Sequence, residues 1–426
     1  MRRRTTATLA LCGLFGWLVV AAGPSQAQGS DQHWVASWAA SPTDAATLAD
    51  AVGLPVPGPL TEQTFRMIVT PHLAGGSLRI HLSNRFQSAA RTFGEVTVGT
   101  AGDGSVQNPV SVTFNGKKEV TAAAGQDVIS DPVAFPVKAF TPLAVSIYVP
   151  GLQAGPTKHW NANASSFYSP PLLGNLTKNT DNLGVPLQTK AWFFVDGVDV
   201  EASSQTQAVV AFGDSITDGL VAATAASLPA SSDVADKNGR YPDDLQRRLI
   251  NAQIPVSVVN AGISSNRLLT DGSGQFLGPK GLDRLKADAL DQAGVTGVLL
   301  LEGINDLGIP PTTSTGDQLI AGYEQAITAI HNAGKKIWLG TLMPASNALF
   351  DGTLFAPKSE TYRQQVNTWI RTKAKVDGVV DFDAAMRDPS NPAVLKPDYA
   401  GPDNLHPNLV GYQAMADAIN LNMLHS

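Results

Sequence analysis

The sequence is almost without cysteine. Its 426 residues include one cysteine, Cys12, which lies in an N-terminal segment that we expect to be removed. The mature chain then holds no disulfide, no cysteine metal site and no cysteine nucleophile. Charged residues are also few, at 15% against 43% hydrophobic residues. This composition is typical of an ordinary globular protein and excludes a disordered or fibrous chain.

The N-terminal segment reads "MRRRTTATLALCGLFGWLVVAAGPSQAQ". Three arginines precede an apolar run from Ala7 to Gly23, and the small residues Ser25 and Ala27 follow. This order predicts a secretory signal peptide over residues 1–27, and hence a secreted or periplasmic protein. A retained membrane anchor is the alternative, but the run is short for a bilayer and no stop-transfer charges follow it. The export route, general secretion or twin-arginine, stays open.

Basic residues are also in deficit. Without the three N-terminal arginines the chain has 27 basic against 36 acidic residues, a formal charge of −9. A net negative chain is a poor non-specific ligand for nucleic acid or anionic lipid. We therefore expect no nucleic-acid partner and no stable membrane insertion after signal cleavage. Composition does not indicate an oligomeric state.

Two regions differ in pattern. Residues 31–200 contain short β-like runs such as "SLRIHLSNRF" and "PLAVSIYVPG", separated by turn signals such as "AGDGS" and "FNGKK". Short strands at regular spacing predict an antiparallel β-sandwich-like accessory domain. The stretch Asp196 to Gln207 is predicted to be the linker, with residues 201–207 between the domains.

Residues 208–426 alternate apolar runs with helical segments. The runs are "AVVAFGDS", "VSVVNAGI", "GVLLLEGIND", "KIWLGTLMP" and "GVVDFDAAM". Between them lie "YPDDLQRRLINAQ", "LDRLKADALDQAG", "DQLIAGYEQAITAIHNAG" and "SETYRQQVNTWIRTKAK", and a last helix is expected over about Leu409 to Leu424. Such alternation predicts an α/β domain with a parallel sheet and helices on each side.

Four polar or small residues follow predicted strands or precede the last helix: Ser215, Gly262, Asn305 and His406, the last with Asp403 three residues before it. In an open parallel sheet, functional groups gather at the carboxyl edge of the strands. A serine hydroxyl needs a base within hydrogen-bond reach to act as a nucleophile, and a carboxylate can hold a histidine in the right tautomer for that task.

His406 is the base that the sequence favours. His331 lies at a predicted helix end before a Gly-Lys turn, and His425 is next to the last residue. Acyl transfer also needs hydrogen-bond donors for the oxyanion. Gly262 would let its backbone N–H approach a substrate closely, or it forms a tight turn; Asn305 offers a side-chain amide, or it caps a loop.

The stretches "GDSITDG", "NAGISSNR", "GINDLG" and "DNLHPN" resemble, in order and spacing, the four motif blocks of the GDSL/SGNH hydrolase family. The resemblance implies a three-layer α/β/α flavodoxin-like domain and a serine esterase with no cofactor and no metal. It makes Ser215 the nucleophile and first oxyanion N–H donor, Gly262 the second N–H donor and Asn305 the side-chain donor. His406 is then the base and Asp403 its orienting partner.

One departure is Ile216, where the name-giving motif has leucine. The absence of a G-x-S-x-G elbow disfavours the α/β-hydrolase fold. The stretch "HWVASWAASP" ahead of a β-rich region resembles the secreted acylhydrolase/arylesterase branch of the family.

Several further residues have two interpretations. Asp214, Thr217 and Asp218 are expected to hold the turn around the serine. Arg267 and Glu302 either face the substrate or form a structural ion pair. The stretch that contains Phe276 and Leu277 is a candidate mobile loop at the rim of the site.

His72 and His81 lack a recognisable metal-ligand spacing and are expected at the surface of the β-rich region. The tryptophans of that region either stack on sugar rings or, more commonly, lie in the core: Trp34, Trp38, Trp160 and Trp192.

The sequence therefore predicts a secreted serine esterase with an acyl-enzyme on Ser215, acting on short-chain acyl groups, such as acetyl, on saccharides or similar alcohols. The partner is a small-molecule or polysaccharide ester. The alternatives are a lipid esterase or lysophospholipase, an acyltransferase to a sugar hydroxyl, and a non-catalytic saccharide-binding protein.

Overall fold

The computed structural model describes residues 32–272, 278–309, 313–348 and 351–425. The predicted signal peptide and the stretch with Phe276 and Leu277 lie outside the described residues. Residues from Gln32 onward form one compact unit. Among the described residues, no helix is both long and apolar enough to cross a bilayer.

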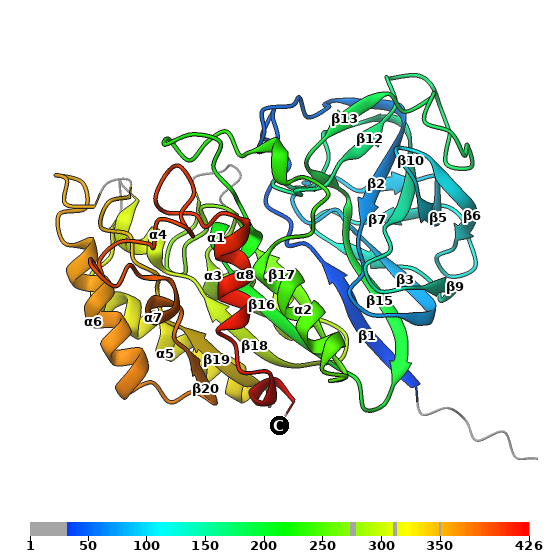
Figure 1. Cartoon of the computed structure of the whole chain (residues 1–426). Coiled ribbons are helices and arrows are strands. Elements are labelled where there is room, and N and C mark those ends of the chain that lie inside the picture. Colours follow the sequence, from blue (N-terminus) through cyan, green and yellow to red (C-terminus); the bar gives the residue numbers. More distant parts are fainter. Residues whose placement is uncertain (1–31, 273–277, 310–312, 349–350, 426) are drawn as a thin grey trace, which may run out of the picture. The chain divides into compact units, whose positions relative to one another are not determined.

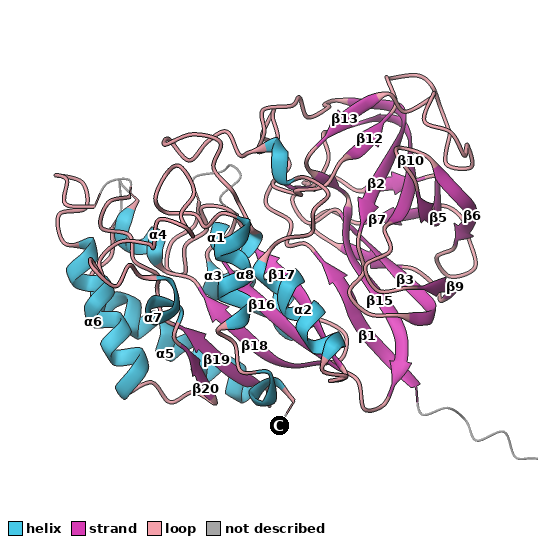
Figure 2. Cartoon of the chain, viewed as in Figure 1, coloured by secondary structure: helices cyan, strands magenta, loops and turns pink. Residues whose placement is uncertain are grey.

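The first half of this unit consists of antiparallel sheets (Figures 1 and 2). A five-stranded sheet has the order β1-β15-β3-β8, with β9 also paired to β3: β1 Gln32–Ala39, β3 Gly75–Ser83, β8 Asp127–Ile129, β9 Val133–Val137 and β15 Val195–Ser203. A six-stranded sheet has the order β13-β12-β2-β10-β5-β6: β2 Leu60–Val69, β5 Glu95–Ala101, β6 Val106–Val112, β10 Leu143–Gln153, β12 Ser166–Tyr168 and β13 Leu187–Thr189.

Two short ribbons complete the β-rich region. They pair β4 with β7 and β11 with β14: β4 Arg91–Phe93, β7 Val120–Ala122, β11 Lys158–His159 and β14 Trp192–Phe193.

The alternation read from the sequence places one face of β3 in the core. Leu78, Ile80 and Leu82 are fully buried, whereas Arg79 and His81 between them are only partly buried and pair with Asp199. Residues from both sheets belong to one apolar core, so each sheet buries its apolar face against the other. The β-rich region is thus confirmed.

The second half contains a five-stranded parallel sheet with the order β17-β16-β18-β19-β20, and this parallel sheet is confirmed. Its strands are β16 Gln207–Gly213, β17 Val256–Gly262, β18 Val295–Leu301, β19 Lys336–Gly340 and β20 Gly378–Val380. The first strand along the chain lies between the second and the third, as in flavodoxin-like sheets. Ligands bind such sheets at the carboxyl ends of the strands beside this reversal. The three-layer arrangement itself stays a prediction.

The helices follow the strands in chain order (Figure 1): α1 Ser215–Asp218, α2 Tyr241–Asn251, α3 Gly281–Leu285, α4 Ile304–Gly308, α5 Gly316–Asn332, α6 Ser359–Thr372, α7 Phe382–Met386 and α8 Leu409–Asp417. Two expectations need correction. The helix expected from Leu282 is α-helical only to Leu285 and continues as a π-helix over Lys286–Leu290. The last helix ends at Asp417, and Leu421–Leu424 forms a 3₁₀ turn.

The linker prediction is wrong for most of its length. Asp196 to Ser203 belongs to β15, which pairs with both β1 and β3, so only residues 204–206 lie between β15 and β16. A stretch of alternating small, acidic and apolar residues reads as a linker, but here it is a central strand of an antiparallel sheet.

β1 belongs to both halves of the fold. Its Val35 and Ala36 are part of the core of the parallel-sheet region, whereas Trp38 belongs to the core of the β-rich region. The Ala36 N–H donates to the Ala293 carbonyl at 2.9 Å, and the Ser257 hydroxyl donates to the Ala36 carbonyl at 2.7 Å.

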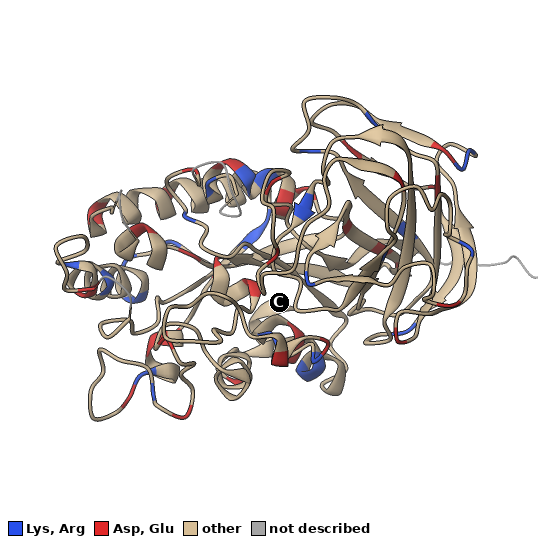
Figure 3. Ribbon diagram, turned by 90° about the horizontal axis from the view of Figure 1, so that it is seen from above, with Lys and Arg blue, Asp and Glu red and all other residues tan. Residues whose placement is uncertain are grey.

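Charged residues of both signs are scattered over the ribbon (Figure 3).

Candidate active site

Ser215 follows directly from the end of β16. Gly213 closes that strand, and a Cβ there would lie 2.1 Å from the Leu301 carbonyl, so only glycine fits. Asp214 then caps α1, because its Oδ1 accepts a hydrogen bond from the Ile216 N–H at 3.0 Å. Ser215 is the first residue of α1, and the first N–H groups of a helix have no acceptor within it. Its hydroxyl and its N–H therefore both stand at the carboxyl edge of the sheet.

His406 lies next to Ser215 and joins it to Asp403. Its Nε2 is 2.7 Å from the Ser215 Oγ, and its Nδ1 is 2.6 Å from the Asp403 Oδ2. The other Asp403 oxygen accepts hydrogen bonds from the backbone N–H groups of Leu405 and His406, at 3.1 and 3.0 Å. The structure thus brings together the three residues that the sequence proposed as nucleophile, base and orienting carboxylate.

The electrostatics of this row fix its proton positions. Burial of Asp403 opposes ionisation, but the hydrogen bond and charge of His406 outweigh burial and lower the pKa of Asp403 to about 2. A carboxylate can only accept, so Nδ1 carries a proton and Nε2 is left to accept from the Ser215 hydroxyl. This is the tautomer in which the imidazole can take the serine proton.

Asn305 lies in the first turn of α4, just beyond β18, and is 2% exposed. One proton of its Nδ2 goes to the Asn266 carbonyl at 2.9 Å. The second proton has no partner among the described residues, and Asn305 lines the same pocket as Ser215. A side-chain donor thus faces the pocket, as the sequence proposed.

Gly262 differs from its prediction. Its backbone N–H donates to the Asn260 Oδ1 at 2.7 Å, and it does not line the pocket. A Cβ at this position would lie 2.2 Å from the backbone nitrogen of Asp218. The glycine therefore permits close packing of β17 against α1, and its N–H is already used. We correct the predicted second N–H donor on this ground.

Ser265, three residues after Gly262, is the better candidate for the second backbone N–H donor. It lines the pocket together with Ser215, and its N–H has no hydrogen-bond partner in the described part of the chain. Its φ of 63° lies in the left-handed region, where serine is uncommon. The preceding residue fixes this turn, because the N–H and hydroxyl of Ser264 donate to the Asp218 Oδ2 at 3.0 and 2.5 Å.

A pocket of about 160 Å³ opens beside Ser215 and His406. Its lining near these residues is mainly apolar: Leu220, Leu228, Ile304, Ile309, Ala345 and Leu405. Arg363 and Glu360 also line it, but they pair with each other, through two hydrogen bonds of 2.7 Å each. Asp351 lines it as well and accepts hydrogen bonds from the Ser359 hydroxyl and the Glu360 N–H. The pocket thus combines an apolar surface with charged groups that are held by other protein groups.

Carboxylates buried under the pocket have raised pKa values. Burial raises the pKa of Asp214 to about 7 and that of Glu302 to about 8. Glu302 does not line the pocket; its closest cation is Arg284, 3.6 Å away, and neither carboxylate oxygen has a hydrogen-bond partner among the described residues. Arg267 donates instead to the Ile309 carbonyl at 2.6 Å. Of the two interpretations, the structure gives Glu302 a structural one, with Arg284 as its neighbour.

The structure also corrects the surface assignment of His72, which is 5% exposed and bonds to Asp243 of α2 at 3.0 Å. The sequence held no signal for this contact, because Asp243 lies 171 residues away. Trp38, Trp160 and Trp192 are buried, and no tryptophan lines the pocket. In the described residues, no group of three or more histidine, aspartate or glutamate side chains is arranged to hold a metal ion.

Comparison with known proteins locates this site within a family. Residues 211–414 match the family model of the GDSL-like Lipase/Acylhydrolase family. Residues 211–414 therefore form a GDSL-like lipase/acylhydrolase domain. The match contains Ser215, Asn305, Asp403 and His406, so the family prediction is confirmed, and with it the prediction of a carboxylic ester hydrolase. No curated protein matches the chain in a sequence search.

Solved structures similar to this GDSL-like chain each cover 50% of it. A putative lipolytic protein of the G-D-S-L family from Desulfitobacterium hafniense is 18% identical over 97% of its own length, with a TM-score of 0.34. The aryl esterase of M. smegmatis is 16% identical over 96%, with a TM-score of 0.40. A carbohydrate acetylesterase from Sinorhizobium meliloti is 14% identical over 96%, with a TM-score of 0.40.

Proposed function

We propose that the protein is a serine esterase that cleaves carboxylic esters through an acyl-enzyme on Ser215. The observation that carries the proposal is the continuous hydrogen-bonded row from Ser215 through His406 to Asp403 at the edge of an apolar pocket. We further propose the three-layer flavodoxin-like arrangement for this domain, which the strand order of its sheet supports.

In the first half of the reaction, His406 Nε2 takes the Ser215 proton as Oγ attacks the ester carbonyl carbon. The carbonyl oxygen becomes an oxyanion and accepts from the N–H groups of Ser215 and Ser265 and from the free Nδ2 proton of Asn305. The tetrahedral intermediate then collapses, and the imidazolium gives its proton to the leaving alkoxide. The alcohol departs and the acyl group stays on Ser215.

In the second half, a water molecule takes the place of the alcohol. Nε2 removes one proton from the water as its oxygen attacks the acyl carbon, and the same donors hold the second oxyanion. Collapse returns the proton to Ser215 Oγ and releases the carboxylic acid. Asp403 keeps its negative charge throughout, in keeping with its pKa of about 2, and stabilises the imidazolium formed in each half.

The substrate that the pocket favours is an ester with a small apolar acyl or aryl group, since such a group would replace water on the apolar lining. Short acyl chains, including acetyl, fit this proposal. Support for a saccharide alcohol is weaker, because no tryptophan lines the pocket. A lipid esterase and an acyltransferase to a sugar hydroxyl use the same acyl-enzyme and remain the alternatives. A secreted or periplasmic location is proposed from the N-terminal segment alone.

The test is turnover of p-nitrophenyl esters from acetyl to long acyl chains by the purified protein and its Ser215→Ala variant. We expect turnover by the parent, none by the variant, and an optimum at short chains. An optimum at long chains would replace the proposal with a lipid esterase. A folded protein inactive on every ester would contradict it, and binding to saccharides would then favour the non-catalytic alternative. A sugar acceptor added to the assay would reveal acyl transfer as an acylated sugar.

A further inference from the structure

The β-rich region inserts a histidine beneath the active-site turn. His159 lies on β11 and is 4% exposed. Its Nε2 is 3.0 Å from the Asp218 Oδ1 and 3.1 Å from the Asn161 carbonyl, and its Nδ1 is 2.7 Å from the Ser41 carbonyl. Each of these partners accepts hydrogen bonds, so both ring nitrogens donate only when the ring carries two protons. A hydrogen bond between a ring N–H and a carboxylate is charge-assisted and is among the strong ones.

Asp218 connects this histidine to the substrate pocket. It is the last residue of α1, the helix that begins at Ser215. While Oδ1 is held by His159, Oδ2 accepts from both the N–H and the hydroxyl of Ser264. Ser264 immediately precedes Ser265, which lines the pocket and whose N–H has no hydrogen-bond partner among the described residues. The carboxylate of Asp218 therefore ties the nucleophile helix to the turn that carries the proposed oxyanion donor.

Other contacts from the β-rich region hold the same end of α1. The Asn163 Nδ2 donates to the Gly219 carbonyl at 2.6 Å. The Arg240 Nε donates to the Asp218 carbonyl at 2.7 Å, and its Nη2 donates to the Ala162 carbonyl of the β-rich region. Of these groups, His159 is the one that holds the Asp218 carboxylate, which in turn bonds to Ser264.

We propose that His159 is a positioning residue for the reaction: by holding Asp218 it fixes the turn Ser264–Ser265 and thereby aims the Ser265 N–H at the oxyanion. The β-rich region then has a part in catalysis, because it supplies this support for the donor. The proposal rests on the proposed esterase function. A displacement of about 1 Å in a positioning group costs on the order of 10²-fold in rate, and loss of one oxyanion donor costs about 10²–10³-fold.

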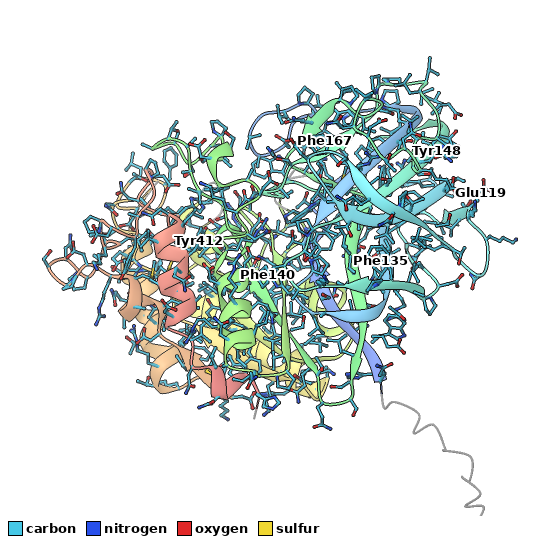
Figure 4. The ribbon with its side chains drawn as sticks, turned by 45° about the vertical axis from the view of Figure 1, so that its right-hand side comes forward. Glu119, Phe135, Phe140, Tyr148, Phe167 and Tyr412 are labelled. Carbon is cyan, nitrogen blue, oxygen red and sulfur yellow. The ribbon has the colours of Figure 1, made fainter. Side chains whose placement is uncertain are left out.

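His72 provides a matched control. It also comes from the β-rich region, is 5% exposed, and places its Nε2 3.0 Å from a carboxylate, that of Asp243 on α2. Its Nδ1 is 2.6 Å from the Val258 carbonyl in the middle of β17. Its ring packs on Phe140, with ring centroids 5.0 Å apart, and Phe140 lies beside α2 (Figure 4). None of these partners lines the pocket. Replacing His72 thus removes an equivalent buried contact whose link to the oxyanion turn is indirect, since it runs from Asp243 through Arg240 to the Asp218 carbonyl.

The experiment compares His159→Ala, His159→Gln and His72→Ala by kcat and KM on a p-nitrophenyl ester that the parent enzyme cleaves, below each variant's unfolding temperature. In His159→Ala we expect kcat to fall about 10- to 100-fold while KM changes less than about threefold, because the lost interaction acts on the transition state. In His159→Gln, an amide N–H near the former Nε2 restores a donor to Asp218, and most of kcat should return. In His72→Ala kcat should stay within about threefold of the parent, although its unfolding temperature falls as well.

Equal kcat values in His159→Ala and His72→Ala, or a loss in His159→Ala expressed in KM alone, would overturn the inference. A kcat for His159→Gln no higher than for His159→Ala would also count against it. Failure of the proposed function has a different signature: an inactive parent enzyme, or a Ser215→Ala variant as active as the parent. Either of these would overturn both proposals, whereas wild-type-like kcat in His159→Ala overturns only this one.

Discussion

The Asn305 side chain gives a prediction whose size follows from its contacts. Its Nδ2 has two protons, of which one is used on the Asn266 carbonyl at 2.9 Å. The change Asn305→Ala removes the other from the oxyanion and leaves the donors of Ser215 and Ser265 in place. Loss of one such donor typically lowers kcat about 10²–10³-fold, which is about 2.7–4 kcal/mol of transition-state stabilisation.

The assay is steady-state hydrolysis of a short p-nitrophenyl ester, with kcat and KM determined separately, and thermal unfolding of the same sample. We expect the loss in kcat, with KM nearly unchanged, because the oxyanion exists only in the transition state and intermediate. Asn84→Ala is the control, since Asn84 is also buried and its Nδ2 donates to the Ala123 carbonyl at 2.9 Å, within the β-rich region. A folded Asn305→Ala enzyme that loses less than about tenfold in kcat, or no more than the control, would refute the reasoning.

Three further outcomes are expected. Gly262→Ala places a Cβ 2.2 Å from the Asp218 backbone nitrogen and shifts α1, so kcat should fall about 100-fold. Ser265→Gly keeps the backbone N–H at a φ of 63°, which glycine adopts readily, so kcat should stay within about threefold of the parent value. The reverse order of the two kcat values in steady-state kinetics would contradict the assignment of the donor. Ala345→Phe fills the apolar pocket and should move the optimum of the p-nitrophenyl ester series toward shorter chains; an unchanged optimum would place the acyl group elsewhere. Glu302, with its pKa raised to about 8 from 4.5 by burial, keeps its proton in the folded state over a pH range where the unfolded state has lost it. Stability should therefore fall as pH rises from about 5 to 8, and Glu302→Gln should make that fall shallower in urea unfolding at a series of pH values, whereas Asp214, whose pKa burial also raises, should keep its own share of the fall.

The parallel-sheet half of the fold is predictable because its signals are local. Each strand is a short, nearly continuous apolar run, and each helix between strands has polar and apolar residues at helical spacing. The positions of Ser215, Asn305 and His406 follow from the same logic, because residues after parallel strands meet at one edge. Contacts between residues far apart in the sequence cannot be predicted in this way. Tyr412 on α8 (Figure 4), for example, donates to the Leu220 carbonyl at 2.6 Å, across 192 residues.

The error at Gly262 has a different cause. A glycine suggests a close approach of the backbone, and the approach is real, but it is made by α1 and not by the substrate. Ser265 has a positive φ and lines the pocket, yet serine gives no sequence signal for that conformation. The identity of a residue thus indicates which backbone conformations are permitted, and tertiary packing decides which of them the residue adopts.

The contacts between the two halves could not be predicted. His72 and His159 each meet an aspartate of the other half, Asp243 and Asp218 respectively. Their neighbours in the sequence read as ordinary β-strand and loop residues. Most of β15 reads as a linker in the sequence, and a linker predicts a separate β-rich domain without contacts to the active-site turn.

The most direct test of the central claim is covalent labelling with diethyl p-nitrophenyl phosphate, followed by intact mass and peptide mapping. An activated serine should displace p-nitrophenol and give one diethylphosphoryl group per chain, on Ser215, with a matching loss of ester hydrolysis. His406→Ala should label far more slowly, and Ser215→Ala not at all. Labelling at another residue, or full hydrolytic activity in a protein that takes up no label, would contradict the assignment of Ser215 as the nucleophile.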